Sequence, residues 1–271
     1  IHSKEFGRIA TQNAKNVILQ KIREEERKVL YDQYYGMEKE VVTGIVQRVM
    51  GKNVSVNLGK ADGILSENEQ VKGEEFEPTE RIKVYILEVK DTPKGPRILL
   101  SRTHPGLVKR LFESEVAEVK DGTVEIKSIA REAGSRTKIA VWSNDPDVDP
   151  VGACVGMNGA RVNSIVEELR GEKIDIINWD ENPAILIENA LSPAKVIAVM
   201  ADPDEKTALV VVPDYQLSLA IGKEGQNARL AARLTGFKID IKSETQARES
   251  GELYDYDDED EYYDEEEYSE E

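Results

Sequence analysis

The pattern of apolar positions near the start of the chain is helical. Between residues 3 and 35, apolar side chains such as Ile9, Val17 and Ile18 recur at helical spacing among Lys, Arg and Glu. This spacing predicts one long helix, whose simplest role is to pack against or connect neighbouring domains. The first residue is Ile1, inside the helical pattern, so we expect a further segment upstream of it.

From residue 37 to about residue 103 the apolar positions follow strand spacing instead. Val54, Val56 and Leu58 alternate with polar residues, and similar short apolar runs lie near 41–49, 82–86 and 98–100. Gly44 interrupts the first run and is a plausible bulge or bend. Five short strands in under about 70 residues are typical of a small closed β-barrel of the OB type.

Two later segments are copies of one unit. Their central loops, Gly156-Met157-Asn158-Gly159 and Gly222-Lys223-Glu224-Gly225, lie about 66 residues apart, a spacing that indicates an internal repeat. Each copy also ends alike, with Gly-x-Lys-Ile-Asp-Ile at 171–176 and at 236–241. The repeat therefore covers much more than the two glycines.

Local signals predict the elements around each loop. Asp149 and Pro150 are suited to the N-cap and first position of a short helix, and Asp214 can cap its counterpart. The second glycine of each loop opens a longer helix, and Gly171 and Gly236 suit helix ends. A helix and two strand-like runs precede the two helices that flank each loop. The predicted order is therefore helix, strand, strand, helix, G-x-x-G, helix, strand.

This arrangement suits a phosphate chain. A loop with glycine at its ends lets the backbone approach a sugar-phosphate chain, and the next helix presents free N–H groups to phosphate. A helix-turn-helix without a ligand is the simpler alternative, and it fits the first copy better because Met157-Asn158 carries no charge. The candidate residues for binding such a chain are Val155, Gly156, Met157, Asn158, Gly159 and Arg161 in the first copy, and Ile221, Gly222, Lys223, Glu224, Gly225, Gln226, Asn227, Arg229 and Arg233 in the second.

The net charge of -17 argues against a nucleic-acid binder until its distribution is considered. Residues 251–271 hold 13 Asp and Glu and no Lys or Arg, which leaves 40 acidic against 36 basic residues in the remainder. This Tyr-rich acidic tail is expected to be disordered. Its simplest role is solvation, and the alternative is that its carboxylates and tyrosines imitate RNA and compete for the loops.

The order of elements around the G-x-x-G loops resembles the bacterial-type (type II) KH domain, which clamps about four nucleotides of single strand. The stretches Val42 to Val46, Val56 to Gly59 and Asp62 to Leu65 resemble the barrel of ribosomal protein S-one. Ser55 and Ser66 stand where that family often has an aromatic residue and a histidine for stacking. We therefore expect the barrel to be a weak RNA platform.

The whole order resembles the NusA family of transcription factors, from about residue 3 to residue 248. The resemblance implies an α+β multidomain chain, with a connector helix at 1–36, an OB-fold barrel at 37–103, KH domains at 104–180 and 181–246, and the acidic tail at 247–271. It further implies a cytoplasmic, monomeric bacterial protein that binds nascent single-stranded RNA and modulates pausing, termination and antitermination. Its partners would be RNA polymerase, through the upstream domain, and other Nus-type factors. The short 180–183 connection predicts one continuous surface across both KH domains.

Other classes of function have little support in the sequence. Only His2 and His104 are available as histidine ligands, without Cys or acidic neighbours at metal-ligand spacing, and no G-x-x-x-x-G-K-[ST] loop occurs. We expect no catalytic residue, metal or cofactor. The single cysteine, Cys154, excludes a disulfide within a monomer. The open alternatives are an accessory part of an RNA-degrading enzyme such as polynucleotide phosphorylase, and a duplex-DNA reader.

Overall fold

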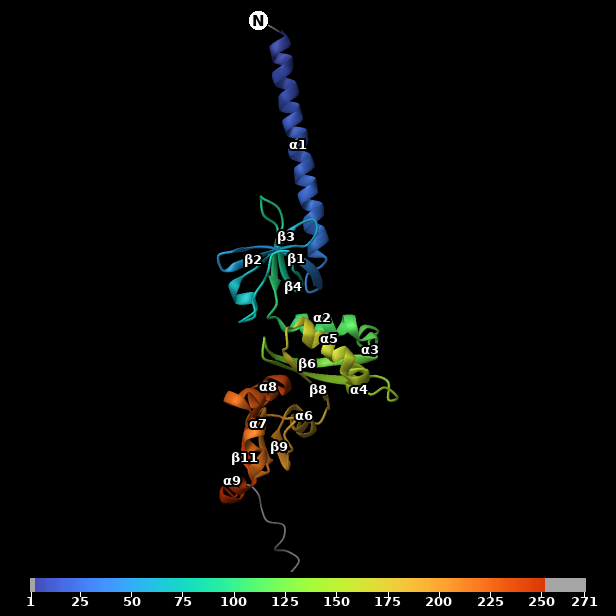
Figure 1. Cartoon of the computed structure of the whole chain (residues 1–271). Coiled ribbons are helices and arrows are strands. Elements are labelled where there is room, and N and C mark those ends of the chain that lie inside the picture. Colours follow the sequence, from blue (N-terminus) through green and yellow to red (C-terminus); the bar gives the residue numbers. More distant parts are fainter. Residues whose placement is uncertain (1–2, 252–271) are drawn as a thin grey trace, which may run out of the picture. The chain divides into compact units, whose positions relative to one another are not determined.

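The computed structural model describes residues 3–251, and the chain divides into two compact units within them (Figure 1). The first unit holds residues up to 124 together with 131–137 and 145–174, and the second holds 125–130, 138–144 and the residues from 175 onward. The acidic tail, apart from its first residues, lies outside the described part of the chain.

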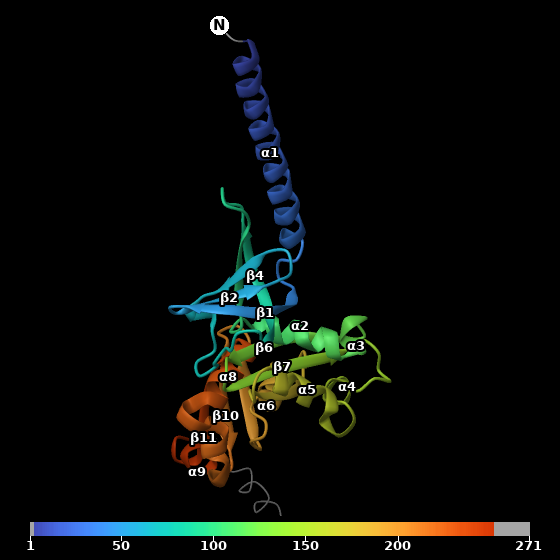
Figure 2. The ribbon, with the colours of Figure 1, turned by 45° about the horizontal axis from the view of Figure 1, so that its top comes forward.

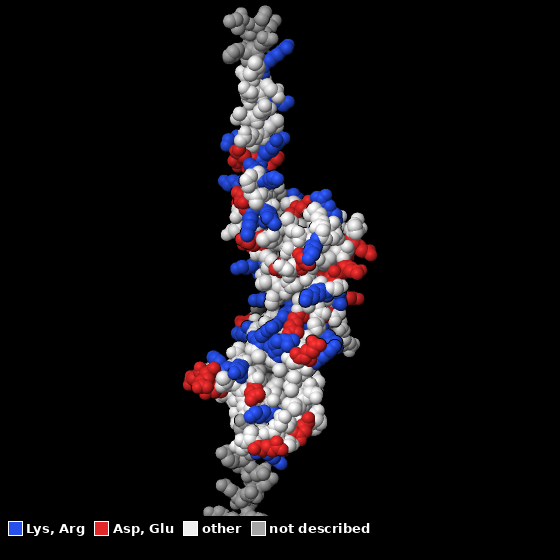
Figure 3. Space-filling model, turned by 90° about the vertical axis from the view of Figure 1, so that its left-hand side faces the viewer, with Lys and Arg blue, Asp and Glu red and all other residues white. Residues whose placement is uncertain are grey.

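The predicted long helix is confirmed as α1 (Ser3–Tyr35). Its last turns lie beside the barrel and the rest of the helix extends away from it, as both ribbon views show (Figures 1 and 2). Tyr34 is 2% exposed in the barrel core, and its hydroxyl donates to the Leu58 carbonyl at 3.1 Å. On the face drawn in Figure 3, the N-terminal part of this helix carries Lys and Arg, and acidic side chains join them only toward the barrel.

The predicted barrel is also confirmed. Five strands close in the order β1-β2-β3-β5-β4, with β3 and β5 parallel and the other neighbours antiparallel. Val56, Leu65, Val84, Ile86, Ile98 and Leu100 are fully buried in the core. The strands are β1 (Val41–Met50), β2 (Asn53–Asn57), β3 (Asp62–Leu65), β4 (Arg81–Lys90) and β5 (Arg97–Ser101), with the 3-10 helix η1 (Glu67–Glu69) between β3 and β4.

The bulge in β1 is not at Gly44. Gly44 pairs regularly with Ile82, and the register shifts between Val46 and Arg48 instead. Gly44 has a different reason to be glycine, because a Cβ there would lie 2.3 Å from Cγ1 of Val56. The residue is required by close packing inside the barrel rather than by an irregular backbone.

The first KH repeat has the predicted order of elements, with one extra helical turn, α3. Its three strands form a sheet in the order β6-β7-β8. The elements are α2 (Pro105–Glu115), α3 (Ala117–Lys120), β6 (Val124–Glu132), β7 (Arg136–Ser143), α4 (Pro150–Val155), the 3-10 turn η2 (Met157–Gly159), α5 (Ala160–Glu168) and β8 (Lys173–Asn178).

The second KH repeat follows the same order in a sheet β11-β10-β9. Ala130, Ala140 and Ile177 of the first repeat's strands join its hydrophobic core. The elements are α6 (Pro183–Ala190), β9 (Ala198–Asp202), β10 (Thr207–Val212), η3 (Asp214–Gln216), α7 (Leu217–Ile221), η4 (Lys223–Gly225), α8 (Gln226–Thr235), β11 (Lys238–Ser243) and α9 (Glu244–Glu249).

Two local expectations need correction at the end of this repeat. Asp149 caps α4 as predicted, but the Asp214 carboxylate does not cap α7 and instead accepts hydrogen bonds from the amide and hydroxyl of Thr245, in the first turn of α9. Helix α9 was not predicted. It begins with a capping box between Ser243 and Gln246, so the repeat continues past residue 246.

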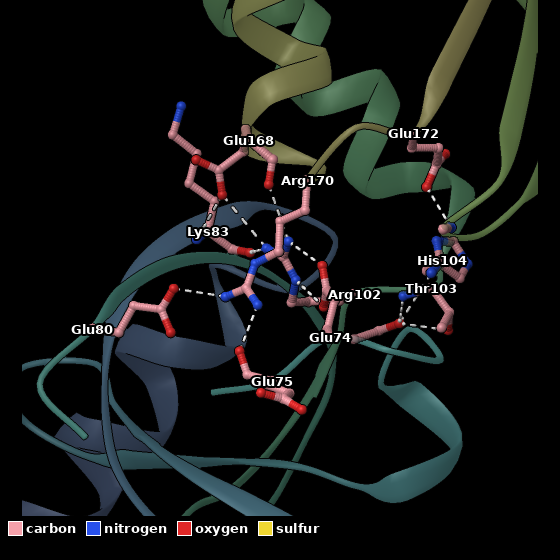
Figure 4. A network of polar contacts seen from close by, with 12 residues as sticks. Glu74, Glu75, Glu80, Lys83, Arg102, Thr103, His104, Glu168, Arg170 and Glu172 are labelled. Atoms are coloured by element: carbon pink, nitrogen blue, oxygen red, sulfur yellow. Dashed lines mark hydrogen bonds and ion pairs between the residues drawn. The ribbon is translucent and has the colours of Figure 1, made fainter. Parts of the chain in front are cut away.

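A buried arginine joins the barrel to the first KH repeat (Figure 4). Arg102 is 1% exposed, and its Nε and Nη2 donate to the two carboxylate oxygens of Glu74 at 2.7 and 2.6 Å. Its remaining donors reach the carbonyls of Lys83, in the barrel, and Glu168, at the end of α5. Burial lowers the pKa of Arg102, but the bonds and charges of Glu74 and Glu168 outweigh it and hold the pKa above its ordinary value.

A second buried pair lies inside the first repeat. Arg131 Nε and Nη2 donate to the Glu172 carboxylate at 2.8 and 2.9 Å, and the Thr137 hydroxyl and Gly134 amide donate to it as well. Glu172 is 1% exposed. Burial alone would raise its pKa, but these four donors lower it below the ordinary 4.5.

Replacing Arg102 with Met is expected to lower the free energy of unfolding by about 3–5 kcal/mol, because the Glu74 carboxylate is left buried without its partner. The double variant Arg102→Met, Glu74→Met should recover much of this loss. Urea unfolding followed by circular dichroism measures both. Arg110→Ala, which removes partly exposed ion pairs with Glu40 and Glu113 and a bond to the Lys39 carbonyl, is the control. Equal losses in the single and double variants would contradict this account.

Glu172 makes the free energy of unfolding depend on pH in the acid range. Its pKa is depressed in the folded state, so its contribution is complete above the ordinary value of 4.5 and disappears as the pH falls through the lowered pKa. Glu172→Gln should therefore be less stable than the parent at pH 7, by about 3 kcal/mol, with a difference that narrows below pH 4.5. Unfolding at several pH values tests this, with the exposed Glu167→Gln as control. A difference that stays constant with pH is the contrary result.

Candidate nucleic-acid interface

The two glycine loops have the same backbone conformation. Gly156 and Gly222 have φ/ψ of 74/175° and 77/172°, and Gly159 and Gly225 have 78/12° and 76/14°. The third position agrees too, with 54/25° at Asn158 and 53/27° at Glu224. Three of four residues in each loop thus lie at positive φ, which L side chains rarely adopt.

The first glycine of each loop is required by space as well as by φ. A Cβ on Gly222 would lie 2.8 Å from the backbone nitrogen of Asn227, and one on Gly156 would lie 2.8 Å from Cγ of Arg161. A Cβ on Gly225 would meet nothing closer than 3.8 Å. The chain therefore folds back tightly over the start of the next helix, whose first N–H groups have no partner within that helix.

The side chains between the glycines point outward. Met157 is 85% exposed, and Asn158, Lys223 and Glu224 are exposed as well. Just before the loops, Ile221 is 38% exposed and Val155 is half-buried, so both present apolar surface beside the backbone. The second loop offers a cation and the first does not.

The predicted polar residues after the loops fall into two groups. Arg229 and Arg233 are exposed on α8, and Arg229 Nη1 donates to the Glu224 carbonyl at 3.0 Å. Gln226 is half-buried at the start of the helix. Asn227, in contrast, is only 3% exposed. Its amide lies inside the domain, so the side chain is placed to hold the loop and not to reach a ligand.

Two further exposed side chains lie on the segment that leads into the second loop. Tyr215 is 77% exposed and Leu219 is 44% exposed. Neither was among the predicted residues. Their spacing of four along a helical segment was the available signal, since it places both on one face.

The barrel presents little for bases to stack on. Phe76 and Tyr85 are the only aromatic residues between 37 and 103, a range that the structure describes in full. Phe76 is half-buried with the Arg170 guanidinium 5.1 Å from its ring, and Tyr85 is 6% exposed and stacked on His104. Ser55 does not face outward at all, being 5% exposed and bonded to Gln47.

Other chemistry finds no support in the described residues. Burial raises the pKa of the Cys154 thiol to about 11, so it stays protonated near neutral pH. Within residues 3–251, no three His, Cys, Asp or Glu residues are grouped to hold a metal ion. In the same range no helix combines the length and apolar character needed to cross a membrane.

A closed five-stranded barrel followed by two KH folds with matching G-x-x-G loops defines a multidomain RNA-binding protein. Family comparison agrees for each part: residues 36–101 match the S1 RNA binding domain, 102–179 the NusA-like first KH domain and 183–249 the NusA-like second KH domain. Residues 1–28 match part of the NusA N-terminal domain. The chain belongs to the NusA family of transcription termination/antitermination proteins.

Curated relatives support this membership along almost the whole chain. The transcription termination/antitermination protein NusA of Bacillus subtilis is 61% identical over 92% of this chain and 67% of its own length. Those of Mycobacterium tuberculosis and Thermus thermophilus are 50% and 46% identical over 88% of this chain, covering 72% and 62% of their own lengths. The chain thus spans about two thirds of the relatives it matches, and their names describe transcription factors.

Replacing the two glycines of the second loop with Ala is expected to have unequal effects. Gly225→Ala strains φ only, at a cost of about 1–2 kcal/mol. Gly222→Ala adds a 2.8 Å contact with the backbone of Asn227, so its loss of unfolding free energy should be larger. Thermal unfolding of both variants measures this, with Gly171→Ala, at positive φ in open space, as control. Equal losses at 222 and 225 would mean that the loop yields to the added methyl.

Proposed function

We propose that this chain binds single-stranded RNA along its two G-x-x-G loops, and that the RNA is the nascent transcript during elongation. In this role it modulates pausing, termination and antitermination. The observation that carries the proposal is the agreement of the two loop backbones to within a few degrees at three positions. Two copies under one conformational constraint are expected to share one ligand chemistry, and glycine-ended loops at helix starts suit a phosphate chain.

The two loops are expected to contribute differently. Lys223, Arg229 and Arg233 supply cations at the second loop, and Tyr215 offers an exposed ring on which a base can stack. Met157 and Asn158 give the first loop contacts without charge. The second loop should therefore supply more of the affinity, and most of its salt dependence.

The remaining parts take supporting roles in this proposal. The barrel acts mainly as a spacer or protein-contact surface, because both of its aromatic rings are covered. RNA polymerase, through an upstream domain, and other Nus-type factors are the proposed protein partners of a cytoplasmic, monomeric, non-enzymatic chain. An accessory role in RNA degradation is not favoured, since the relatives are named as transcription termination/antitermination proteins.

The test is the fluorescence anisotropy of a labelled single-stranded RNA of about ten nucleotides, long enough for two KH sites, at two salt concentrations. The variant Lys223→Asp, Glu224→Asp places two carboxylates where phosphate is expected, and Asp tolerates the positive φ of position 224. We expect it to weaken binding at least tenfold and to lower the salt slope by about one.

The matched variant Met157→Asp, Asn158→Asp tests the first loop in the same way. A smaller loss there than in the second loop supports the proposed division of roles. Equal binding by the parent and both variants would move the RNA site away from the loops. Duplex DNA as competitor separates a single-strand clamp from a helix-turn-helix reader.

A further inference from the structure

Asn227 is the second residue of α8, directly behind the second loop, and the Nδ2 of its buried side chain donates only to carbonyls inside the domain. Nδ2 donates to the carbonyls of Ala220 and Leu191 at 3.0 Å each, and lies 3.5 Å from the carbonyl of Leu219. Leu219 and Ala220 are in α7, just before the loop. The side chain therefore connects the helix that enters the loop with the helix that leaves it.

The Leu191 carbonyl belongs to a segment distant in sequence from the loop. Leu191 begins the connection between α6 and β9, and this connection is itself fixed. The ammonium of Lys138, 0% exposed in β7, donates to the Ser192 carbonyl at 2.7 Å and pairs with Asp175 at 3.0 Å. Asn227 thus joins the loop to a connection whose next residue is bonded to a buried lysine.

The same connection supports the other side of the loop. The Lys195 amide donates to the Gln216 side chain at 3.2 Å, where the α7 segment begins. The connection from Leu191 to Lys195 hence touches the start of both helices that flank the loop. These bonds support the loop conformation, with its three positive φ values. The support matters most at Glu224, because that residue, unlike the two glycines, does not favour positive φ.

The first repeat shows the same device built from different residues. Arg161 stands where Asn227 stands, and its Nη1 donates to the Ala153 carbonyl at 2.7 Å, just as Asn227 reaches Leu219. The same nitrogen donates to Glu118 at 2.9 Å. Glu118 lies in α3, between the first helix and the first strand of its repeat, which is the place that Leu191 occupies in the second.

We propose that Asn227 and Arg161 are positioning residues, which hold the two glycine loops in their RNA-binding conformation without contacting RNA through their side chains. The proposal rests on the loops being the RNA site. It assigns the second loop a neutral support, from Asn227 to backbone carbonyls, and the first a charged one, from Arg161 to Glu118. The Asn227 Oδ1 is buried without a hydrogen-bond partner, which is unfavourable. The two Nδ2 hydrogen bonds to the carbonyls of Leu191 and Ala220 offset this cost.

Three variants test this at the second loop, at a temperature where every protein is folded. Asn227→Ala removes all donors, and Asn227→Ser keeps one short donor as the conservative variant. Thr235→Ala removes a side-chain hydrogen bond from the other end of α8 and is the control for a general loss of stability. RNA affinity is measured beside amide hydrogen exchange at residues 222–225, with the β10 amides as reference.

Asn227→Ala is expected to weaken binding about tenfold and to speed exchange of the loop amides relative to β10, with Asn227→Ser between it and the parent. Thr235→Ala should change neither the RNA affinity nor the exchange rate of the loop amides relative to β10. If Asn227→Ala lowers the melting temperature but leaves the RNA affinity and the relative loop exchange unchanged, Asn227 is structural only and the proposal fails.

The first loop provides an independent arm that does not depend on the folding of Asn227 variants. Glu118→Gln removes the charge from the half-exposed pair with Arg161, and it should speed amide exchange at residues 156–159 without affecting 222–225. Unchanged exchange there would overturn the inference for Arg161.

The variant Lys223→Asp, Glu224→Asp separates this inference from the proposed function. If that variant loses RNA and Asn227→Ala does not, the loop is the site and the positioning role is wrong. If neither variant changes RNA affinity, the loops are not the RNA site and both proposals fail together.

Discussion

The architecture of both KH repeats depends on one backbone constraint, the reversal of the chain between two helices through three residues at positive φ. Glycine meets this constraint at the first and last positions, but Asn158 and Glu224 adopt it at a cost of about 1 kcal/mol or more each. Such a conformation persists only where the surroundings determine it. The hydrogen bonds of Arg161 and Asn227 to the carbonyls before each loop are among these surroundings, together with the bond from Arg229 to the Glu224 carbonyl.

Buried charge fixes the geometry of the elements that carry the first loop. Arg102 joins the barrel to the end of α5, and Arg131 with Glu172 connects β6 to the start of β8. Pairs of this kind add little net stability over apolar residues of the same shape, because desolvation offsets their attraction. Their effect is on the specificity of the fold instead, since the donors of each buried arginine can be satisfied in only one arrangement of the surrounding elements. Both contacts lie at or just after the C-terminal end of helix α5, which starts at the first loop.

The net charge of the chain and the local charge at the second loop have opposite signs. The chain carries a net charge of -17, yet the second loop is surrounded by Lys223, Arg229 and Arg233. Long-range repulsion of RNA is screened within about 8–10 Å at physiological salt, so local cations decide whether a phosphate chain can bind. An acidic chain with a locally basic loop is therefore consistent with an RNA-binding member of the NusA family.

The sequence by itself determined the repeat and the order of the main elements, but not the short helices α3 and α9. Helical and strand periodicity predicted α1, the five barrel strands and both KH sheets, and capping by Asp149 predicted the start of α4, because these signals act between residues close along the chain. The glycine loops were equally visible, since positive φ selects glycine whatever the distant surroundings.

Only the tertiary structure decided which polar residues turn inward. Asn227 and Arg102 look like surface residues in the sequence, and both are buried because their partners lie far away along the chain, Asn227 reaching Leu191 and Arg102 reaching Glu74 and Glu168. Asp214 was expected to cap a helix and bonds Thr245 instead, for the same reason. Hydrogen-bond partners that folding brings together have no regular spacing in the sequence, so no sequence pattern can reveal them. These partners decide which polar residues near the loops are buried beneath them and which are exposed.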